Sequence, residues 1–174
     1  MSNKKIWSGV LPLTILAAMI GGLILLGQVS GQIDEGIIEN GIETNGIAFD
    51  EGSRMVNIRY NVNGTEYTRG IGKGFSNIED GEEFLIKYLP EDPTSIVVFF
   101  NKPILSDKYA YSKTECIYLD KTFSVVDFQY KVNGEIIKRE ALYEDNQSLN
   151  PADYIVQYRT ERPTIGYLIQ NSKD

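Results

Sequence analysis

Histidine is absent from the 174-residue sequence, and cysteine occurs once, at Cys116. Without an imidazole, the chain cannot use Ser-His or Cys-His nucleophilic catalysis or build a histidine-containing zinc site. A single cysteine cannot form a disulfide within the chain, and without a CxxC partner we expect Cys116 to be an inert buried thiol. We therefore predict no catalytic, cofactor-binding or metal-binding residues, and we expect that the protein is not an enzyme.

Acidic residues are missing from the first thirty positions, where the charged residues are Lys4 and Lys5. Residues 31–174 carry 15 basic and 24 acidic side chains, so the body of the protein is acidic. A surface of this sign repels phosphate groups. The sequence therefore argues against nucleic acid and the anionic lipid surface as partners.

Charged residues are also absent from residues 6–26, which are mostly apolar. At about 1.5 Å per residue, a helix of this length spans a hydrocarbon core about 30 Å thick. We predict a transmembrane signal anchor over residues 6–27, giving a single-pass protein of the cell membrane. Lysines before the span and acids after it place the N-terminus in the cytoplasm and the body in the periplasm or outside the cell. The alternative is a signal peptide cleaved at residues 29–31, but its apolar region normally has only about 7–15 residues.

Small residues recur at a spacing of four within this span. Ala17 precedes Gly21, and Ala18 precedes Gly22, by four positions. This spacing allows two membrane helices to approach closely, which would make a homo-oligomer. Small residues are common in membrane helices in any case, so both interpretations stay open.

The rest of the chain is predicted to be a tandem duplication. Residues 47–100 align with residues 117–170 without a gap, at a constant offset of 70 positions. Average composition would give roughly three or four identities over this length. The alignment instead has 12, which in the first copy are Ile47, Asp50, Val56, Tyr60, Val62, Asn63, Gly64, Arg69, Tyr88, Glu91, Pro93 and Thr94. Such an internal repeat predicts two copies of one small structural unit.

Apolar and polar residues alternate over residues 56–62 and 126–132, which predicts a half-buried strand in each copy. Each strand is followed by an Asn-Gly pair, Asn63-Gly64 or Asn133-Gly134, that favours a type I′ hairpin turn. Further strands are expected at residues 45–49, 84–89, 95–100, 115–119, 154–159 and 165–170. About five short strands per copy indicate a small barrel or bent sheet of the SH3-like or OB-like kind.

The predicted fold class is therefore mainly β, with one N-terminal transmembrane helix and two tandem five-stranded units. A core this small is marginal, so we expect the two units to pack together and to fold together. The expected order is a cytoplasmic N-terminus (1–5), an anchor (6–27), a linker (28–39), a first β-unit (40–100), a connection (101–112) and a second β-unit (113–174).

Two charged positions recur in both copies, as Arg69 and Arg139 and as Asp50 and Asp120. The expected structural role is an Arg–Asp pair that closes the end of each barrel, and the functional alternative is an arginine that faces a ligand. A cluster of acids at residues 79–83 lacks the spacing of an EF-hand. We therefore expect a solvated turn there rather than a calcium site.

A resemblance to a known family is carried by three stretches: NGIAF at residues 45–49, VNIRYNVNGTEYT at 56–68 and GEEFLIKYLPEDPTS at 81–95. Together with the membrane span, they resemble a family of bacterial membrane-anchored proteins with a small β-domain, catalogued only as a domain of unknown function. The second copy departs from the pattern, because Pro151 stands where the first copy has Gly81. The resemblance implies a bacterial source and supplies no catalytic residues.

These observations favour a membrane-tethered binding or scaffold protein that engages an envelope protein outside the cytoplasm. A specific alternative is an immunity-type inhibitor that neutralises a toxin at the membrane. A less favoured alternative is a hydrolase that uses carboxylates alone, as glycosidases use paired acids. Tyrosine, with 11 copies, is enriched at protein interfaces and supports the binding interpretation.

Overall fold

The computed structural model describes residues 34–49, 52, 55–72, 78–144 and 147–171. The predicted anchor at residues 6–27, with the small residues inside it, lies outside the described part of the chain. No helix within the described ranges is long and apolar enough to cross a membrane. The described chain is mainly β, as predicted.

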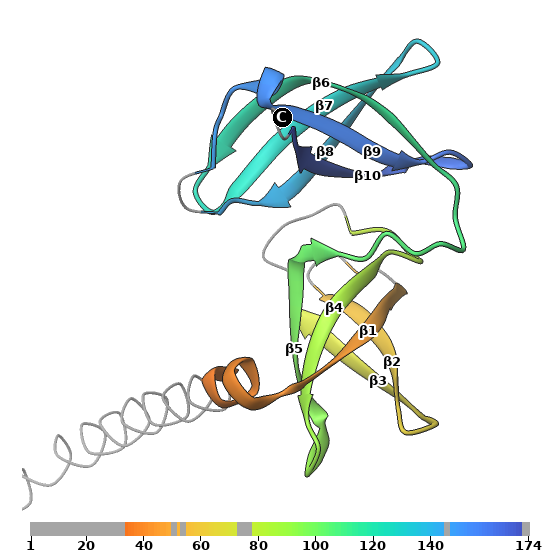
Figure 1. Cartoon of the computed structure of the whole chain (residues 1–174), viewed down its shortest axis with the longest axis vertical. Helices are drawn as coiled ribbons and strands as arrows, with labels where there is room; N and C mark the ends of the chain where they lie inside the picture. Colours follow the sequence, from red (N-terminus) through yellow and green to blue (C-terminus); the bar gives the residue numbers. More distant parts are fainter. Residues whose placement is uncertain (1–33, 50–51, 53–54, 73–77, 145–146, 172–174) are drawn as a thin grey trace, which may run out of the picture.

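Two five-stranded antiparallel sheets follow one another along the chain, and they lie one above the other in Figure 1. The strands of the first sheet are β1 (Ile42–Phe49), β2 (Met55–Val62), β3 (Thr65–Gly72), β4 (Glu83–Leu89) and β5 (Asp92–Pro103). Those of the second are β6 (Tyr111–Thr122), β7 (Val125–Val132), β8 (Glu135–Leu142), β9 (Tyr154–Arg159) and β10 (Arg162–Gln170), with a short 3-10 helix η1 (Pro151–Asp153) before β9.

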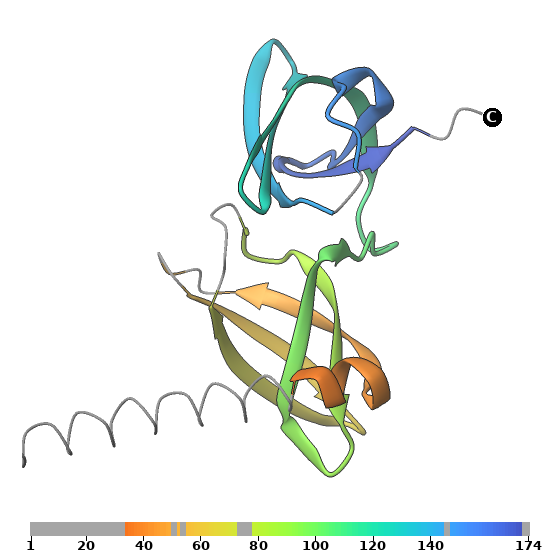
Figure 2. The same ribbon diagram turned by 90° about the vertical axis from the view of Figure 1, so that its left-hand side faces the viewer.

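Both sheets have the same topology, which confirms the two tandem β-units. The orders are β3-β2-β1-β4-β5 and β8-β7-β6-β9-β10, so each strand of one unit has its counterpart in the other. A buried tyrosine makes the same bond in each: the hydroxyls of Tyr60 and Tyr130 donate to the carbonyls of Pro93 and Pro163, both at 2.6 Å. Each sheet is a curled half-barrel (Figure 2), which matches the bent-sheet form of the prediction.

The predicted Asn-Gly turns are also confirmed. Asn63 and Asn133 both have φ of 51°, and the glycines that follow have φ of 87° and 92°. A left-handed backbone at both central positions is what a type I′ turn requires. The turn fixes the register of the hairpin, and the rings of Tyr60 and Tyr67 consequently stack at 5.7 Å across β2 and β3.

The inward side chains of each curled sheet form a separate core. The alternation predicted for β2 and β7 appears as alternating burial along both strands. The first core consists of Ala48, Val56, Ile58, Tyr60, Val62, Ile78, Phe84, Ile86 and Tyr88. The second consists of Cys116, Leu119, Val126, Phe128, Tyr130, Val132, Tyr154 and Val156. Cys116 is buried there as expected, and burial raises the pKa of its thiol.

The boundaries of the predicted linker and connection differ from the structure. Residues 34–40 are helical, and the backbone N–H of Gly41 ends this helix by donating to the carbonyl of Ile37 at 2.8 Å. Ile37 is buried, and Lys87 of β4 donates to the carbonyl of Ile38 at 2.8 Å. The end of the predicted linker is thus packed onto the first unit. The connection is also shorter than predicted, because β5 extends into it and β6 begins within it.

Candidate functional site

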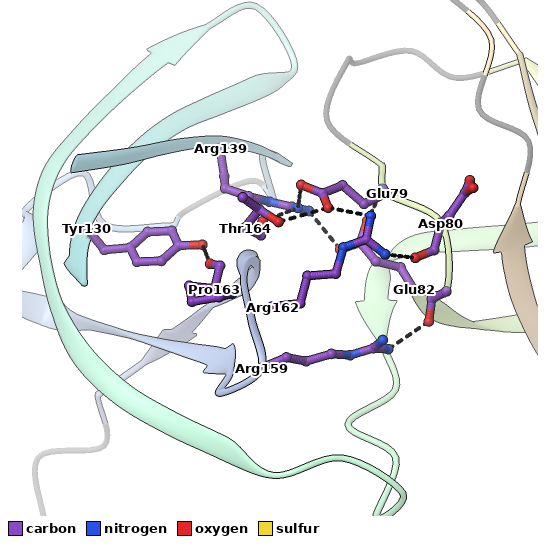
Figure 3. Close-up of polar contacts among 10 residues, drawn as sticks. Glu79, Asp80, Glu82, Tyr130, Arg139, Arg159, Arg162, Pro163 and Thr164 are labelled. Atoms are coloured by element: carbon purple, nitrogen blue, oxygen red, sulfur yellow. Dashed lines mark hydrogen bonds and ion pairs between the residues drawn. The ribbon is translucent and has the colours of Figure 1, made fainter. Parts of the chain in front are cut away.

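The two units meet at the acidic segment, residues 79–83, which precedes β4 and contacts one end of the second unit (Figure 3). Two backbone bonds attach this segment to its own unit: Ala48 donates to the carbonyl of Glu82, and Gly81 donates to the carbonyl of Ala48, both at 2.8 Å. Gly81 has φ of 89°, a conformation that favours glycine. The segment is therefore held by its backbone, and the side chains of Glu79 and Glu82 are directed to the other unit.

A buried ion pair lies at the centre of this junction. Arg139 Nη2 of β8 donates to Glu82 Oε1 at 2.7 Å, and the two residues are 6% and 0% exposed. The other oxygen of Glu82 accepts the backbone N–H of Glu79 at 2.7 Å. Arg139 Nη1 donates to the carbonyl of Thr164 at 2.7 Å. A buried charge pair is tolerated only when such additional bonds satisfy it.

Two further arginines of the second unit complete the junction. Arg162 contacts Glu79 Oε2 at 3.0 Å and donates to the carbonyl of Asp80 at 2.7 Å. Arg159 donates to the carbonyl of Gly81 at 2.7 Å, and it is 3% exposed. The prediction of a solvated turn is therefore wrong for Glu82 and Glu83, which are buried. Glu82 binds Arg139 and Glu83 contacts Lys108 at 3.2 Å, whereas Asp80 is exposed.

Burial governs the proton equilibria at the junction. It raises the pKa of Glu82, against the opposing effects of the Arg139 guanidinium and the backbone N–H of Glu79. Burial also raises the pKa of the Tyr167 hydroxyl, and the nearby charge of Glu82 raises it further. Tyr167 is therefore a neutral hydrogen-bond donor at any physiological pH. No group of three or more acidic or cysteine side chains in the described ranges is placed to hold a metal ion.

A cavity of about 350 Å³ lies between the units beside this ion pair. The first unit contributes Glu82, Phe84 and Phe100 to its lining, and the second contributes Phe128, Arg139 and Tyr167. Asn101 and Glu144, which also line it, form a 2.8 Å hydrogen bond between the units. The lining of the cavity thus combines aromatic rings with polar and charged side chains.

The recurring charged residues do not form the predicted Arg–Asp pairs in the part of the chain described. Arg139 binds Glu82 of the other unit, not Asp120 of its own. Asp120 is exposed and accepts from the Tyr118 hydroxyl and its neighbour's backbone N–H. Arg69 is opposite Ile58 in the hairpin and is exposed, and Asp50 lies outside the described residues.

A β-bulge explains why Asp120 is misplaced. Cys116 pairs with Tyr130, but Tyr118 rather than Ile117 pairs with Gln129, so β6 contains one extra residue. The equivalent strand β1 has no such shift in its pairing with β2. Side chains alternate between the faces of a strand, so one inserted residue moves those beyond it to the other face. The ungapped alignment of β6 with β1 therefore does not hold beyond Ile117.

The bulge also exposes apolar side chains on the β6–β7 hairpin. Ile117 and Tyr118 are 47% and 43% exposed, whereas Ala48, aligned with Tyr118 in the sequence, is fully buried. At the tip of the hairpin, Phe123 is 92% exposed and has φ of 56°. A bulky residue in this left-handed conformation is a backbone outlier.

Differences between the copies were the signal for the junction in the sequence. Residues 79–83 of the first copy have three glutamates and an aspartate, and their counterparts, residues 149–153, have one acid. Arg159 and Arg162 correspond to Leu89 and Asp92 in the first copy. Acids gained in one copy and arginines gained in the other indicate that the two surfaces meet.

Comparison of the chain with protein-family models, with curated proteins and with solved structures returned no match. The resemblance to a family of bacterial membrane proteins therefore stays a prediction. Functional inference rests on the junction, the cavity and the exposed hairpin.

Proposed function

We propose that the protein is a membrane-tethered binding or scaffold module that engages an envelope protein through its β6–β7 hairpin. The observation that carries the proposal is Phe123, which is 92% exposed at a left-handed backbone position. This conformation costs about 1–2 kcal/mol for a residue other than glycine. An exposed aromatic ring recovers none of that cost by packing within the chain. Strain kept without a gain in stability is typical of functional sites.

The surroundings of Phe123 indicate the chemistry of the partner. Ile117 and Tyr118 add exposed apolar area to the same hairpin. Asp120 and Asp127 pair across β6 and β7 near the tip. An apolar contact with acids beside it fits a protein surface that has an apolar pocket and basic residues at its rim.

The junction supports a scaffold role because it fixes the orientation of the hairpin. The helix at residues 34–40 lies against the first unit, and the hairpin belongs to the second (Figure 1). Between them, the Glu82–Arg139 pair links the units through a buried contact. In this proposal residues 6–27 anchor the chain in the membrane, and the first unit acts as a rigid spacer. We also propose that each unit is a small barrel of the SH3-like or OB-like kind.

The acids of the junction give the hydrolase alternative little support. Glu79 and Glu82 are held by Arg162 and Arg139, and Glu82 is fully buried. A glycosidase needs one carboxyl as acid and one as nucleophile or base beside the substrate. Binding is the function that this arrangement favours.

Site-specific photo-crosslinking in native membranes tests the proposal. A photoreactive residue in place of Phe123 should capture one dominant envelope protein. The matched control replaces Ile136, which is 57% exposed and lies beside the other hairpin turn of the same unit. Equal capture from both positions, or none from position 123, would contradict the proposal. The identity of the captured protein also distinguishes a scaffold role from toxin neutralisation.

A reporter fused to the C-terminus tests the tether. We expect activity from a reporter that needs an oxidising compartment, since the lysines precede the apolar segment and the acids follow it. A reporter that is active only in the cytoplasm would overturn the proposed topology.

A further inference from the structure

The cavity between the units has the size of a small-molecule site. Its volume is about 350 Å³, and ligand pockets typically occupy about 300–1,000 Å³. Residues of both units line it, including Phe84 of β4 and Tyr167 of β10. It therefore exists only while the junction holds the units together.

Two buried polar atoms on residues that line the cavity lack a partner. The Tyr167 hydroxyl and Arg139 Nε are buried and have no hydrogen-bond partner among the described residues. Tyr167 and Arg139 are each 6% exposed, and both residues line the cavity. Buried donors are almost always satisfied in folded proteins, by protein, water or ligand. Because both donors belong to residues that line the cavity, an acceptor atom of a molecule bound there would satisfy them.

The walls favour an aromatic ring. Phe84 and Phe128 are buried, and the Phe100 ring meets the Phe84 ring edge to face at 5.2 Å. Tyr154 also lines the space. Ring faces and edges at these positions accommodate a flat apolar body better than a flexible chain.

The charges in the lining disfavour an anion. Glu82, Glu140 and Glu144 line the cavity, against one cation, Arg139. Arg139 is already neutralised by Glu82 at 2.7 Å. A carboxylate or phosphate would therefore be repelled, although the open donors require an acceptor oxygen.

The geometry points to a binding site for an uncharged, ring-containing small molecule whose carbonyl oxygen accepts hydrogen bonds from the Tyr167 hydroxyl and Arg139 Nε. This site is separate from the exposed hairpin proposed to bind an envelope protein. A ligand that contacts both units stabilises their docked arrangement, because it binds the docked form alone.

Benzamide is a suitable probe, since it has one ring and a neutral carbonyl. We expect the amide signal of Gly166, which lines the cavity, to shift saturably when the isotopically labelled full-length chain is titrated. The dissociation constant should be on the order of 1 mM, as for other small fragments. Benzoate, which has the same ring but a negative charge, should bind about tenfold more weakly or not at all.

Two variants locate the site. Tyr167→Phe should fold normally, because it removes an unpaired hydroxyl, and should weaken benzamide binding about five- to tenfold. Ala141→Phe fills the cavity and should abolish the shift of the Gly166 amide signal. If Ala141→Phe fails to fold, Ala141→Leu is tested in its place. Ile136→Asn, on the exposed surface, is the control and should bind benzamide as the native chain does.

The inference is overturned if benzamide produces no saturable shift at Gly166, which would mean that the cavity holds water only. It is also overturned if benzoate binds as tightly as benzamide, or if Tyr167→Phe and the filled variants keep the native affinity. Loss of hairpin crosslinking would leave these outcomes unchanged, so the two proposals fail separately.

Discussion

At the scale of single residues, Arg139 and Arg69 show how one position can acquire two roles. They are identical in sequence and occupy equivalent places opposite a core residue in their hairpins. Arg69 is exposed, whereas Arg139 is 6% exposed and bound to Glu82. Since removal of one partner leaves a buried charge uncompensated, the two arginines should differ greatly in their contributions to stability.

We therefore expect Arg139→Met to lower the free energy of unfolding by about 3–5 kcal/mol, because it leaves Glu82 buried without its cation. Arg69→Met is the matched control and should change it by less than about 0.5 kcal/mol, as exposed substitutions usually do. Denaturant unfolding of the native chain and of each variant measures these two changes in the free energy of unfolding. Similar losses from the two substitutions would contradict the role given to the junction.

The pKa of Glu82 gives the junction a pH dependence. Burial raises it above the ordinary value of 4.5, so the folded chain holds this proton more tightly than the unfolded chain. The stability that Glu82 contributes is then full below about pH 4.5 and declines as pH rises through the raised pKa. The difference in the free energy of unfolding between the native chain and the Glu82→Gln variant should therefore decrease as pH rises. A difference that grows with pH would show that the pKa is lowered instead.

We expect that Phe123 lowers the stability of the chain and contributes to binding of the envelope protein. Phe123→Asn places a residue that tolerates positive φ at the hairpin tip and loses almost no packing, since the ring is 92% exposed. We expect the free energy of unfolding to rise by about 1 kcal/mol while crosslinking to the envelope protein is lost. Thermal unfolding of this variant tests the stability. Crosslinking from a photoreactive residue placed at the exposed position 118 of the same hairpin, with Phe or Asn at position 123, tests the binding. A destabilised variant would mean that Phe123 has a packing role.

At the scale of elements, β6 and β1 differ by one inserted residue. The β6–β7 ladder passes from Cys116 to Tyr118, and the β6–β9 ladder ends at Glu115, so neither uses Ile117. Its counterpart Ile47 pairs in both neighbouring ladders. The same position is therefore an insertion in one copy and part of the register in the other.

Deletion of Ile117 should consequently be tolerated, with a change in the free energy of unfolding below about 1 kcal/mol, because every β6 pair is kept. Deletion of Ile47 should prevent folding, because it shifts one side of β1 by a residue and turns core side chains outward. Circular dichroism and unfolding curves of the two deletions make the comparison. Equal damage from both would mean that the bulged residue is part of the β6 register.

Local patterns explain which elements were predicted from the sequence. The Asn-Gly turns and the alternation in β2 and β7 depend on neighbouring residues, so each could be recognised within a few positions. The bulge at Ile117 and the Glu82–Arg139 pair depend on how strands and units pack, which a strand pattern does not contain. The partner of Arg139 was missed because both members of a pair were sought within one copy.

At the scale of the whole molecule, the two copies are stacked through dissimilar surfaces. The acidic segment of the first unit meets the end of the second that carries Arg139, Arg159 and Arg162. The second unit has residues 149–153, with one acid, where the first has this segment. A third unit stacked in the same way would therefore lack the acids that hold the first two together, and the stack is specific to two units.

The central claim is that the copies form one folded body through this buried junction, and calorimetric unfolding of the full-length chain tests it most directly. We expect one cooperative transition whose calorimetric and van't Hoff enthalpies agree, as in a single two-state unit. In Arg139→Met, that transition should move to lower temperature or separate into two. Two independent transitions in the native chain would contradict the account, because the units would then fold without the junction.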